Sequence, residues 1–505
     1  MSHFDVVIVG AGLSGIGSAC HLQDKCPGKT FVLLEGRNAL GGTWDLFRYP
    51  GVRSDSDMHT LGYNFKPWRA AEAIADGPSI LSYVREAAEE RGVVDHIRYG
   101  HKVVAAHWST DDAQWTVDAQ CGEERVAFTC TMLLMCGGYY NYDEPHDPAI
   151  AGLERFEGTV VHPQFWPEDL DYAGKKVVVI GSGATAMTLV PAMAENGAEV
   201  TMVQRSPTYV VSMPAVDADA NRLRRFLPED MAYKVTRWKN VRNDVGFYRR
   251  TRTEPEKVKF ELLYMVREAL GPDYDVKTHF TPRYNPWDQR LCLIPDDDLY
   301  NAINAGTASV ETDEIESVTK TGLVLKSGKE LDADIIVTAT GLKLIVASGV
   351  AFDVDGEPVD FPQTYSYKGM MYSDMPNMVQ TFGYINASWT LRSDLTAEFV
   401  CRLINRMDKL GMRQVTPRLR EQDKTMKALP WIDDFSAGYM QRLMHLFPKQ
   451  GDWDPWRHTQ DFAEDKKLIR DAPIDDDVLA FTNPIADGRV ATGDTTASSE
   501  TAAAR

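Results

Sequence analysis

Short runs of consecutive apolar residues, each followed by glycine or an acid, dominate the start of the chain. Residues 4–10 (FDVVIVG) and 30–35 (TFVLLE) are rich in β-branched and aliphatic side chains, a composition typical of strands buried on both faces of a parallel sheet. The small residues at 14–24 predict a helix between them, and residues 131–138 (TMLLMCGG) predict a further buried strand. This order indicates a βαβ unit that opens an α/β domain.

The same pattern begins again further along the chain. Residues 176–181 (KVVVIG) predict a strand that enters a second glycine turn, followed by a helix at 184–196 and a strand at 199–204 (EVTMVQ). Residues 332–341 (DADIIVTATG) are similar to 131–138, because both are apolar strands that end at glycine. The repeat predicts an α/β fold with two Rossmann-like dinucleotide-binding domains, the second inserted in the first.

Residues 218–270 have a different character, with Arg, Lys and aromatic residues at helical spacing and few strand signals. We interpret this region as a helical insert and its basic run as a solvated helix face rather than an anion site. The Ala-, Thr- and Ser-rich end of the chain predicts a disordered tail. We expect the first domain at 1–145 and 341–505, and the second domain at 150–212 and 286–340. The helical insert is expected at 213–285, and the disordered tail at 487–505.

Charge and cysteine content exclude several classes of protein. The formal net charge of −19 disfavours nucleic-acid binding, because phosphate would be repelled. Seven scattered cysteines contain no CxxC pair, which argues against a zinc site, a dithiol relay or a disulfide scaffold and favours a reducing, cytoplasmic location. No metal-ligand spacing is found. We expect neither a signal peptide nor a transmembrane helix, and peripheral membrane association stays open.

The first glycine turn has the pattern GxGxxG, formed by Gly10, Gly12 and Gly15. Gly10 permits the tight turn, Gly12 lets a pyrophosphate approach the backbone, and Gly15 allows close packing of helix on strand. Glu35 ends the next strand, where a carboxylate accepts hydrogen bonds from ribose hydroxyls. The alternative is a solvated glutamate at a strand end. Strand, glycines and acid together favour a dinucleotide site.

The second turn is GSGATA, in which alanine takes the place of the third glycine. Its following strand ends at Gln204 and Arg205 rather than at an acid. Arg205 can pair with a 2′-phosphate, which predicts a preference for NADPH over NADH, although a surface arginine is the alternative. Two such sites suggest one bound redox cofactor and one exchangeable hydride donor. We assign FAD to the first site and NADPH to the second.

A longer motif precedes the second turn. Residues 156–167 carry Phe156, Gly158, His162, Trp166 and Pro167 in the pattern FxGxxxHxxxWP. This pattern resembles the fingerprint of the type I Baeyer–Villiger monooxygenases. GGTWDLFRYPG, RSDSDM, YNPWDQRLC and NASWTL look closest to the ethionamide-type monooxygenase subgroup. Within the fingerprint, His162 and Trp166 are candidates for a hinge that links domain movement rather than for catalysts.

The resemblance implies residue roles position by position. Arg290, in WDQRLC, matches the active-site arginine of the family, and Asp55 matches its partner acid. Gln289 stands where better-known members carry lysine, which leaves Arg205 as the main charge for the 2′-phosphate. The residues implied at FAD are Gly10, Gly12, Ser14, Gly15, Glu35, Thr43, Trp44, Asp45, Leu46, Asp55 and Val103. Those implied at NADPH are Arg53, Ser54, Asp55, Gly181, Ser182, Gly183, Ala184, Thr185, Ala186, Met187, Arg205 and Ser206.

The resemblance also implies an activity. In that family NADPH reduces FAD, and O2 forms a C4a-peroxyflavin that inserts one oxygen atom beside a ketone carbonyl to give an ester or lactone. We expect a small apolar ketone or sulfide as substrate, with oxidation of sulfides or thioamides as a second reaction. Two alternatives stay open: a flavin monooxygenase that acts mainly on sulfur or nitrogen, and a non-catalytic redox-sensing flavoprotein.

Overall fold

The computed structural model describes residues 1–485, and its two largest sheets are separate and have parallel cores. The first sheet has nine strands in the order β18-β17-β4-β5-β6-β1-β2-β3, with β21 also paired to β6. β1, β2, β3 and β21 run parallel to their neighbours, whereas β4, β5 and β6 form an antiparallel meander. The bounds are β1 Ser2–Val9, β2 Phe31–Leu34, β3 Ile97–Arg98, β4 Lys102–Ser109, β5 Gln114–Cys121, β6 Glu124–Met135, β17 Ala351–Val354, β18 Glu357–Pro358 and β21 Met378–Gln380.

Three helices cover one face of this sheet. They are α1 (Leu13–Lys25), α4 (Gly77–Glu90) and α11 (Trp389–Leu410), which share one apolar core with alternate residues of β1 and β2. The remaining residues of these strands pack against β4, β5 and the segment after β17. Because both faces of β1 and β2 are covered, their continuous apolar runs are explained.

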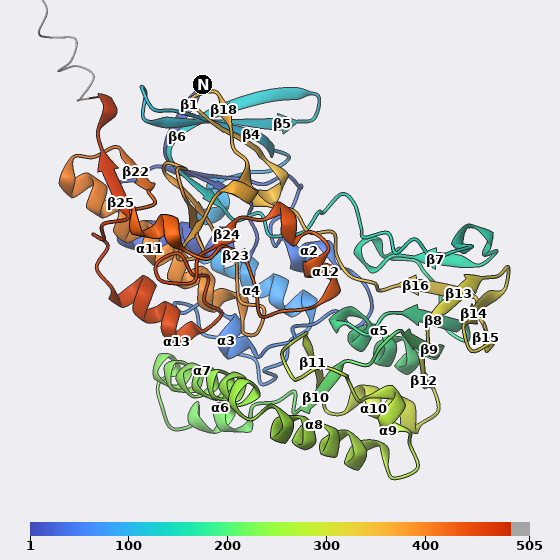
Figure 1. The fold of residues 1–505 in the computed structure, drawn as a ribbon. Coiled ribbons are helices and arrows are strands. Elements are labelled where there is room, and N and C mark those ends of the chain that lie inside the picture. The colour runs from blue at the N-terminus through green and yellow to red at the C-terminus, as the bar shows by residue number, and fades with distance from the viewer. Residues whose placement is uncertain (486–505) are drawn as a thin grey trace, which may run out of the picture.

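The second sheet has five parallel strands in the order β12-β9-β8-β16-β7. Its strands are β7 Thr159–Val161, β8 Lys176–Ile180, β9 Glu199–Gln204, β12 Ala308–Thr312 and β16 Ile335–Thr338. Helices α5 (Ala184–Glu195) and α10 (Asp298–Asn304) cover one face, and the antiparallel strands β13 (Ile315–Val318), β14 (Gly322–Leu325) and β15 (Glu330–Asp332) cover the other. Figure 1 shows this sheet apart from the one that holds β1 and β6.

The chain leaves the first sheet after β6, builds the second, and returns at β17. The predicted fold class is therefore confirmed, whereas the individual domain boundaries stay predictions. The predicted tail at 487–505 lies outside the described residues.

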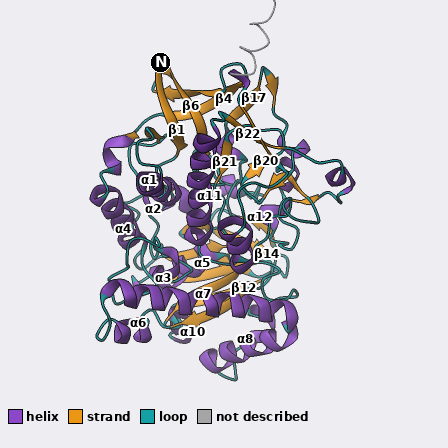
Figure 2. Cartoon of the chain, turned by 90° about the vertical axis from the view of Figure 1, so that its left-hand side faces the viewer, coloured by secondary structure: helices purple, strands orange, loops and turns teal. Residues whose placement is uncertain are grey.

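Helices α6 (Ala218–Leu223), α7 (Glu229–Thr253), α8 (Pro255–Leu270) and α9 (Val276–His279) form the helical insert. It is framed by the parallel strands β10 (Tyr209–Met213) and β11 (Leu291–Pro295), and α7 packs on α3 (Met58–Leu61) of the first domain. Figure 2 shows α6, α7 and α8 along one edge of the molecule. No helix within residues 1–485 is long and apolar enough to cross a membrane.

Candidate active site

Both glycine turns have the same local geometry. Gly10 has a φ of +99° and Gly181 a φ of +130°, which favour glycine. A Cβ at Gly10 would lie 2.8 Å from the carbonyl oxygen of Cys136, and one at Gly181 would lie 2.2 Å from that of Ala339. Cys136 and Ala339 follow the two apolar strands β6 and β16. The two glycine turns predicted from the sequence therefore make the same kind of contact, with the backbone carbonyl group that follows a neighbouring apolar strand.

The first turn leaves a helix N-terminus open. Gly12 precedes α1 with no side-chain cap, so the first N–H groups of that helix remain available to an anion. Gly15 packs so closely that a Cβ there would lie 2.0 Å from the carbonyl oxygen of Gly10. Glu35 is buried, and its Oε2 accepts a hydrogen bond from the Ala11 amide at 2.7 Å. This cradle fits the pyrophosphate and ribose of a dinucleotide.

Other residues expected at FAD lie on helix α2 and strand β4. Thr43, Trp44, Asp45 and Leu46 form the short helix α2. Asp45 is paired with Arg37 at 2.7 Å and with Arg48 at 2.8 Å, so its charge is already balanced. Val103 is buried on β4, where it pairs with Ala119. The structure thus gives Asp45 a role in orienting the loop around α2.

A cavity of about 260 Å³ lies between the two domains. It combines the first turn, the loop before α3, the start of α5 and strand β11. The predicted residues that line it are Gly12, Ser14, Thr43, Trp44, Arg53, Ser54, Asp55, Ala184 and Arg290. Residues that are remote in the sequence therefore meet at one site.

Arg290 and Asp55 form an ion pair in this cavity. Arg290 Nε donates to Asp55 Oδ2 at 3.1 Å, and Nη2 contacts the same oxygen. Asp55 and the nearby Tyr439 and Tyr139 raise the pKa of Arg290 above its usual value, although burial acts in the opposite direction. The guanidinium therefore remains charged, and the Tyr439 side chain also lies within hydrogen-bonding reach of it.

Arg53 and Ser54 are held by the protein itself. Arg53 pairs with Asp298 at 2.6 Å and donates to the Met187 carbonyl oxygen, which ties the loop to α10 and α5. Ser54 is buried and donates to the Ser56 carbonyl oxygen at 2.6 Å. These contacts fix the backbone on either side of Asp55.

The second turn leads into α5, and Gly183 occupies its N-cap position without a side-chain cap. Nothing lies within 4 Å of a Cβ placed at Gly183, so this helix N-terminus also faces open space. Ser182 Oγ donates to the Ser206 carbonyl oxygen at 3.3 Å, which brings the turn and the end of β9 together. Thr185 follows within α5, and Ala186 and Met187 are buried in its packed face.

Arg205 is exposed beside this turn and has a second cation near it. Burial and the charge of Arg205 lower the pKa of Arg442. Two neighbouring arginines repel each other unless an anion lies between them. Arg442 lies more than 230 residues from Arg205 in the chain, and no pattern in the sequence marks it.

The fingerprint residues lie away from the cavity, before and after β7. Phe156 is buried, and a Cβ at Gly158 would lie 2.4 Å from the Asp334 carbonyl oxygen, next to β16. His162 Nδ1 accepts from the Gln164 amide at 3.1 Å, while Gln164 Nε2 donates to the Asn141 and Tyr142 carbonyl oxygens. Burial lowers the pKa of His162 to about 4, so its ring is neutral.

Trp166 completes this motif, with Pro167 directly after it. Its ring packs against the second domain and meets Tyr172 edge-on. Gln164, between His162 and Trp166, contacts the segment at 141–142 that leads from the first domain to the second. A hinge role for His162 and Trp166 stays a prediction.

Gly158→Ala is expected to destabilise the fold by about 1–3 kcal/mol, because the added methyl group overpacks against β16. Gly246→Ala in α7 is the control, since nothing lies within 4 Å of its Cβ. Thermal unfolding followed by circular dichroism compares the two. Equal unfolding temperatures would contradict the packing role of Gly158.

Three further residues of the site were not assigned from the sequence. Trp389 Nε1 donates to Ser14 Oγ at 2.8 Å, Thr43 Oγ1 shares a hydrogen bond with Tyr140 at 2.7 Å, and Tyr439 lies next to Arg290. Trp389 lies in NASWTL, one of the motifs that carry the resemblance, which is the signal that could have found it. Within residues 1–485, no three His, Cys, Asp or Glu side chains gather as a metal site.

Comparison with known proteins agrees with this geometry. Residues 7–218 match the family "Pyridine nucleotide-disulphide oxidoreductase". The chain is 52% identical to the FAD-containing monooxygenase EthA of Mycobacterium tuberculosis over 480 residues, covering 95% of this chain and 98% of the relative. The chain belongs to the FAD-containing monooxygenases. It is also 47% identical to the probable FAD-binding monooxygenase AlmA of Acinetobacter baylyi, covering 95% and 96%.

Solved structures share the fold of this monooxygenase. Oxidized steroid monooxygenase bound to NADP superimposes with a TM-score of 0.75 at 21% identity, covering 95% of this chain and all of that one. Cyclohexanone monooxygenase from Rhodococcus sp. Phi1 bound to NADP+ gives a TM-score of 0.70 at 20% identity, covering 84% and 88%. The resemblance inferred from the sequence motifs is confirmed.

Proposed function

We propose that this monooxygenase is an NADPH- and FAD-dependent Baeyer–Villiger enzyme that converts a small apolar ketone to an ester or lactone and also oxidises sulfides. The observation that carries the proposal is the Arg290–Asp55 pair, which lies in the cavity shared by the first glycine turn and α5. Bound FAD, once reduced by NADPH, supplies the activation of O2. The chain must bind both cofactors and stabilise the charge that develops on oxygen.

Arg290 supplies that stabilisation. Its guanidinium keeps its proton, and an N–H group that is not directed at Asp55 can donate to an oxygen atom that gains negative charge during attack on a carbonyl. Asp55 holds the side chain in place and balances its charge before the substrate arrives. Arg53 and Ser54 keep Asp55 in register, since both are anchored to neighbouring backbone or carboxylate groups.

The NADPH site uses the second turn and two cations. The open N-terminus of α5 faces a pyrophosphate, and Arg205 with Arg442 would neutralise a 2′-phosphate. Better-known Baeyer–Villiger monooxygenases carry a lysine at the position of Gln289. In this chain Arg442 would supply the positive charge that this lysine provides in those enzymes.

Arg205→Ala is expected to raise the KM for NADPH by about 10- to 100-fold, the usual value of a charge-assisted hydrogen bond. The KM for NADH should change little, because NADH has no 2′-phosphate. Arg442→Ala should act in the same direction on NADPH alone. Steady-state oxidation of each nicotinamide measures both variants, and equal effects on NADPH and NADH would contradict this assignment.

The alternative is oxidation of sulfur or nitrogen as the main reaction. A nucleophilic sulfur attacks a protonated oxidant and needs no fixed cation beside it, so the Arg290–Asp55 pair favours ketone oxidation. The non-catalytic alternative is set aside because the chain belongs to a family of enzymes. All seven cysteines are free, which supports a cytoplasmic location.

The test is product analysis with purified enzyme, NADPH and matched panels of linear, cyclic and aryl ketones and sulfides. Esters or lactones identified by gas chromatography support the proposal. Sulfoxides alone, with no ester from any ketone, would overturn it in favour of the sulfur-oxidising alternative.

A further inference from the structure

A second cavity, of about 150 Å³, adjoins the first at Arg290. The two cavities share six lining residues, but the second contains no residue of either glycine turn. The shared residues are Asp55, Ser56, Arg290, Leu293, Ile385 and Ala387. Its remaining walls come from α7, β10, β11 and the loop at 385–388. Most of them are apolar: Ile74, Val211, Met213, Phe247, Trp287, Leu291, Leu293 and Ile385. A cofactor seated on the glycine turns would leave this space free for part of a substrate.

Two polar groups in these walls lack a partner. Trp287 Nε1 is buried without a hydrogen bond within residues 1–485. Asp244 is half-buried, and the influences on its carboxyl group are burial and the charge of Asp57 rather than a hydrogen bond or a cation. An unpaired N–H in an apolar wall is costly, and such groups call for an explanation. Trp287 also has a φ of +67°, a conformation that non-glycine residues rarely adopt outside functional or tightly held loops.

The charge state of Asp244 follows from its neighbours. The other charged groups that line the cavity are Asp55, which is paired with Arg290, and Asp57, which caps α3 through the His59 and Thr60 amides. Burial and the nearby Asp57 raise the pKa of Asp244 to about 7. In its neutral form the carboxyl group has a proton to donate, as the indole N–H of Trp287 does.

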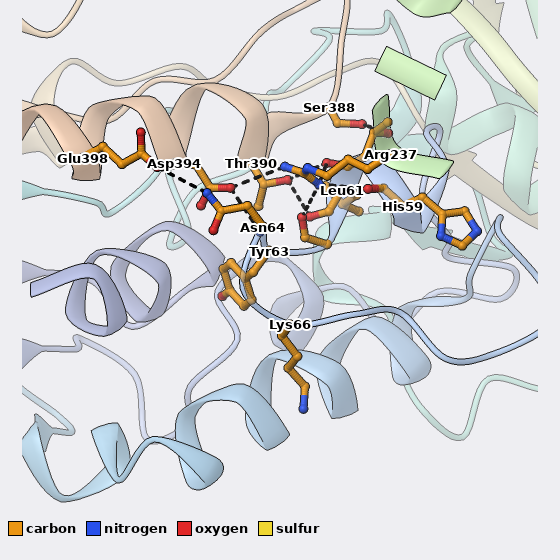
Figure 3. Close-up of polar contacts among 12 residues, drawn as sticks. His59, Leu61, Tyr63, Asn64, Lys66, Arg237, Ser388, Thr390, Asp394 and Glu398 are labelled. Atoms are coloured by element: carbon orange, nitrogen blue, oxygen red, sulfur yellow. Dashed lines mark hydrogen bonds and ion pairs between the residues drawn. The ribbon is translucent and has the colours of Figure 1, made fainter. Parts of the chain in front are cut away.

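Helix α7 is clamped so that Asp244 is held over this cavity. Arg237 Nη1 donates to the carbonyl oxygens of His59 and Thr60 at 2.9 Å each and of Gly62 at 2.7 Å, and Nη2 reaches Asp394 at 3.4 Å. Figure 3 shows the Arg237 side chain between the α3 region and α11. Asp244 follows Arg237 by seven residues, two helical turns, and so lies on the same face of α7.

The turn that carries Trp287 is held from the same helix. Arg252 pairs with Asp288 at 3.0 Å and contacts the Pro286 carbonyl oxygen, and Tyr248 packs edge-on against the Trp287 ring. The two unpartnered donors are therefore both positioned by α7, in a cavity that opens beside Arg290.

We propose that the second cavity is a substrate subsite in which Asp244 and Trp287 Nε1 recognise a hydrogen-bond acceptor remote from the reacting atom. The substrate class is an elongated apolar ketone or sulfide that carries an ether, ester or second carbonyl oxygen along its chain. This assignment rests on the proposed function only in placing the reacting carbonyl or sulfur at Arg290.

The experiment compares a straight-chain methyl ketone with its analogue in which one remote methylene is replaced by an ether oxygen. Binding to the oxidised enzyme is read from tryptophan fluorescence, and turnover from ester formation. At pH 6 the wild type should bind the ether ketone about three- to tenfold more tightly, the range expected of one neutral hydrogen bond. At pH 8 that preference should be lost, because about nine-tenths of Asp244 is then ionised.

Variants at Asp244 separate the effect of its carboxyl group from that of the surrounding cavity. Asp244→Asn keeps a donor that does not titrate and should retain the preference at both pH values. Asp244→Leu should lose the preference at both pH values, and Asn243→Leu, exposed on the same helix, should behave as wild type. Trp287→Phe should reduce the preference in part.

A preference that survives in Asp244→Leu, or that falls with pH in Asp244→Asn as in the wild type, would overturn the assignment. If Asp244→Leu does not fold, the comparison of the wild type with Asp244→Asn across pH still decides. Fluorescence binding also separates the two proposals. Absence of ester from every ketone would reject Baeyer–Villiger activity, whereas the binding preference would still test the subsite.

Discussion

Arg290→Ala is expected to leave FAD bound and to reduce ester formation by at least about 10²–10³-fold, the usual cost of removing one donor from a preorganised oxyanion site. FAD should remain because the Arg290 side chain is held by Asp55, and the residues of the first glycine turn are untouched. The loss falls on the step in which oxygen gains charge. Oxidation of NADPH should also slow if the same guanidinium helps to seat the nicotinamide.

Stopped-flow absorbance under O2, with NADPH-reduced enzyme and ketone, measures the flavin and product steps separately. Arg290→Lys is the matched variant. It restores a positive charge but not the planar group that Asp55 holds through Nε, so we expect little rescue. Ester formation by Arg290→Ala at near wild-type rate would reject the mechanism, while leaving the fold and the cofactor sites as described.

The glycine turns could be predicted from the sequence because their causes are local. Gly10 and Gly181 each follow an apolar strand, and the strands that end at Cys136 and Ala339 supply the carbonyl groups against which they pack. Strand–glycine–helix order is a short-range signal that survives in any tertiary context. The insertion of one domain in the other could also be predicted. It follows from the order along the chain of the two strands that enter glycine turns and the two apolar strands that end at glycine.

The Arg290–Asp55 pair came from a motif resemblance, not from periodicity. The two residues are 235 positions apart, and no local rule brings β11 to the loop before α3. Arg442, Tyr439 and Asp244 were missed for this reason. Each lies on a helix or loop whose position depends on tertiary packing, such as the contacts that Arg237 makes with the end of α3.

Asp45 and the basic run at 218–270 show a further limit. A motif can place Asp45 near the flavin loop, but only the structure shows that Arg37 and Arg48 already balance its charge. A helical pattern rich in Arg and Lys indicates a solvated face, yet the same helix α7 also turns Asp244 and Phe247 into a cavity. The composition of a helix does not show which residues lie on each of its faces, whereas the cavity is lined by residues of one face of α7.

Gly12→Ala is expected to give a folded protein that cannot hold FAD. The backbone of Gly12 lies in the extended region at a φ of −78°, which alanine adopts without strain. An added Cβ would make only an ordinary contact with Gly42 Cα, at 3.5 Å. The methyl group would instead occupy the space in which a pyrophosphate approaches the N-terminus of α1, and so would remove the tightest part of the cofactor site.

Gly15→Ala is the matched control, because its Cβ would lie 2.0 Å from the Gly10 carbonyl oxygen and should destabilise the fold itself, by about 1–3 kcal/mol or more. Unfolding temperatures measured with and without added FAD separate the two effects. The wild type should become more stable as FAD is added, since a ligand that binds only the folded state shifts the unfolding equilibrium. Without FAD, the unfolding temperature of Gly12→Ala should be close to that of the wild-type apoprotein, and added FAD should not raise it. A yellow Gly12→Ala protein that FAD stabilises as much as the wild type would show that the pyrophosphate binds elsewhere.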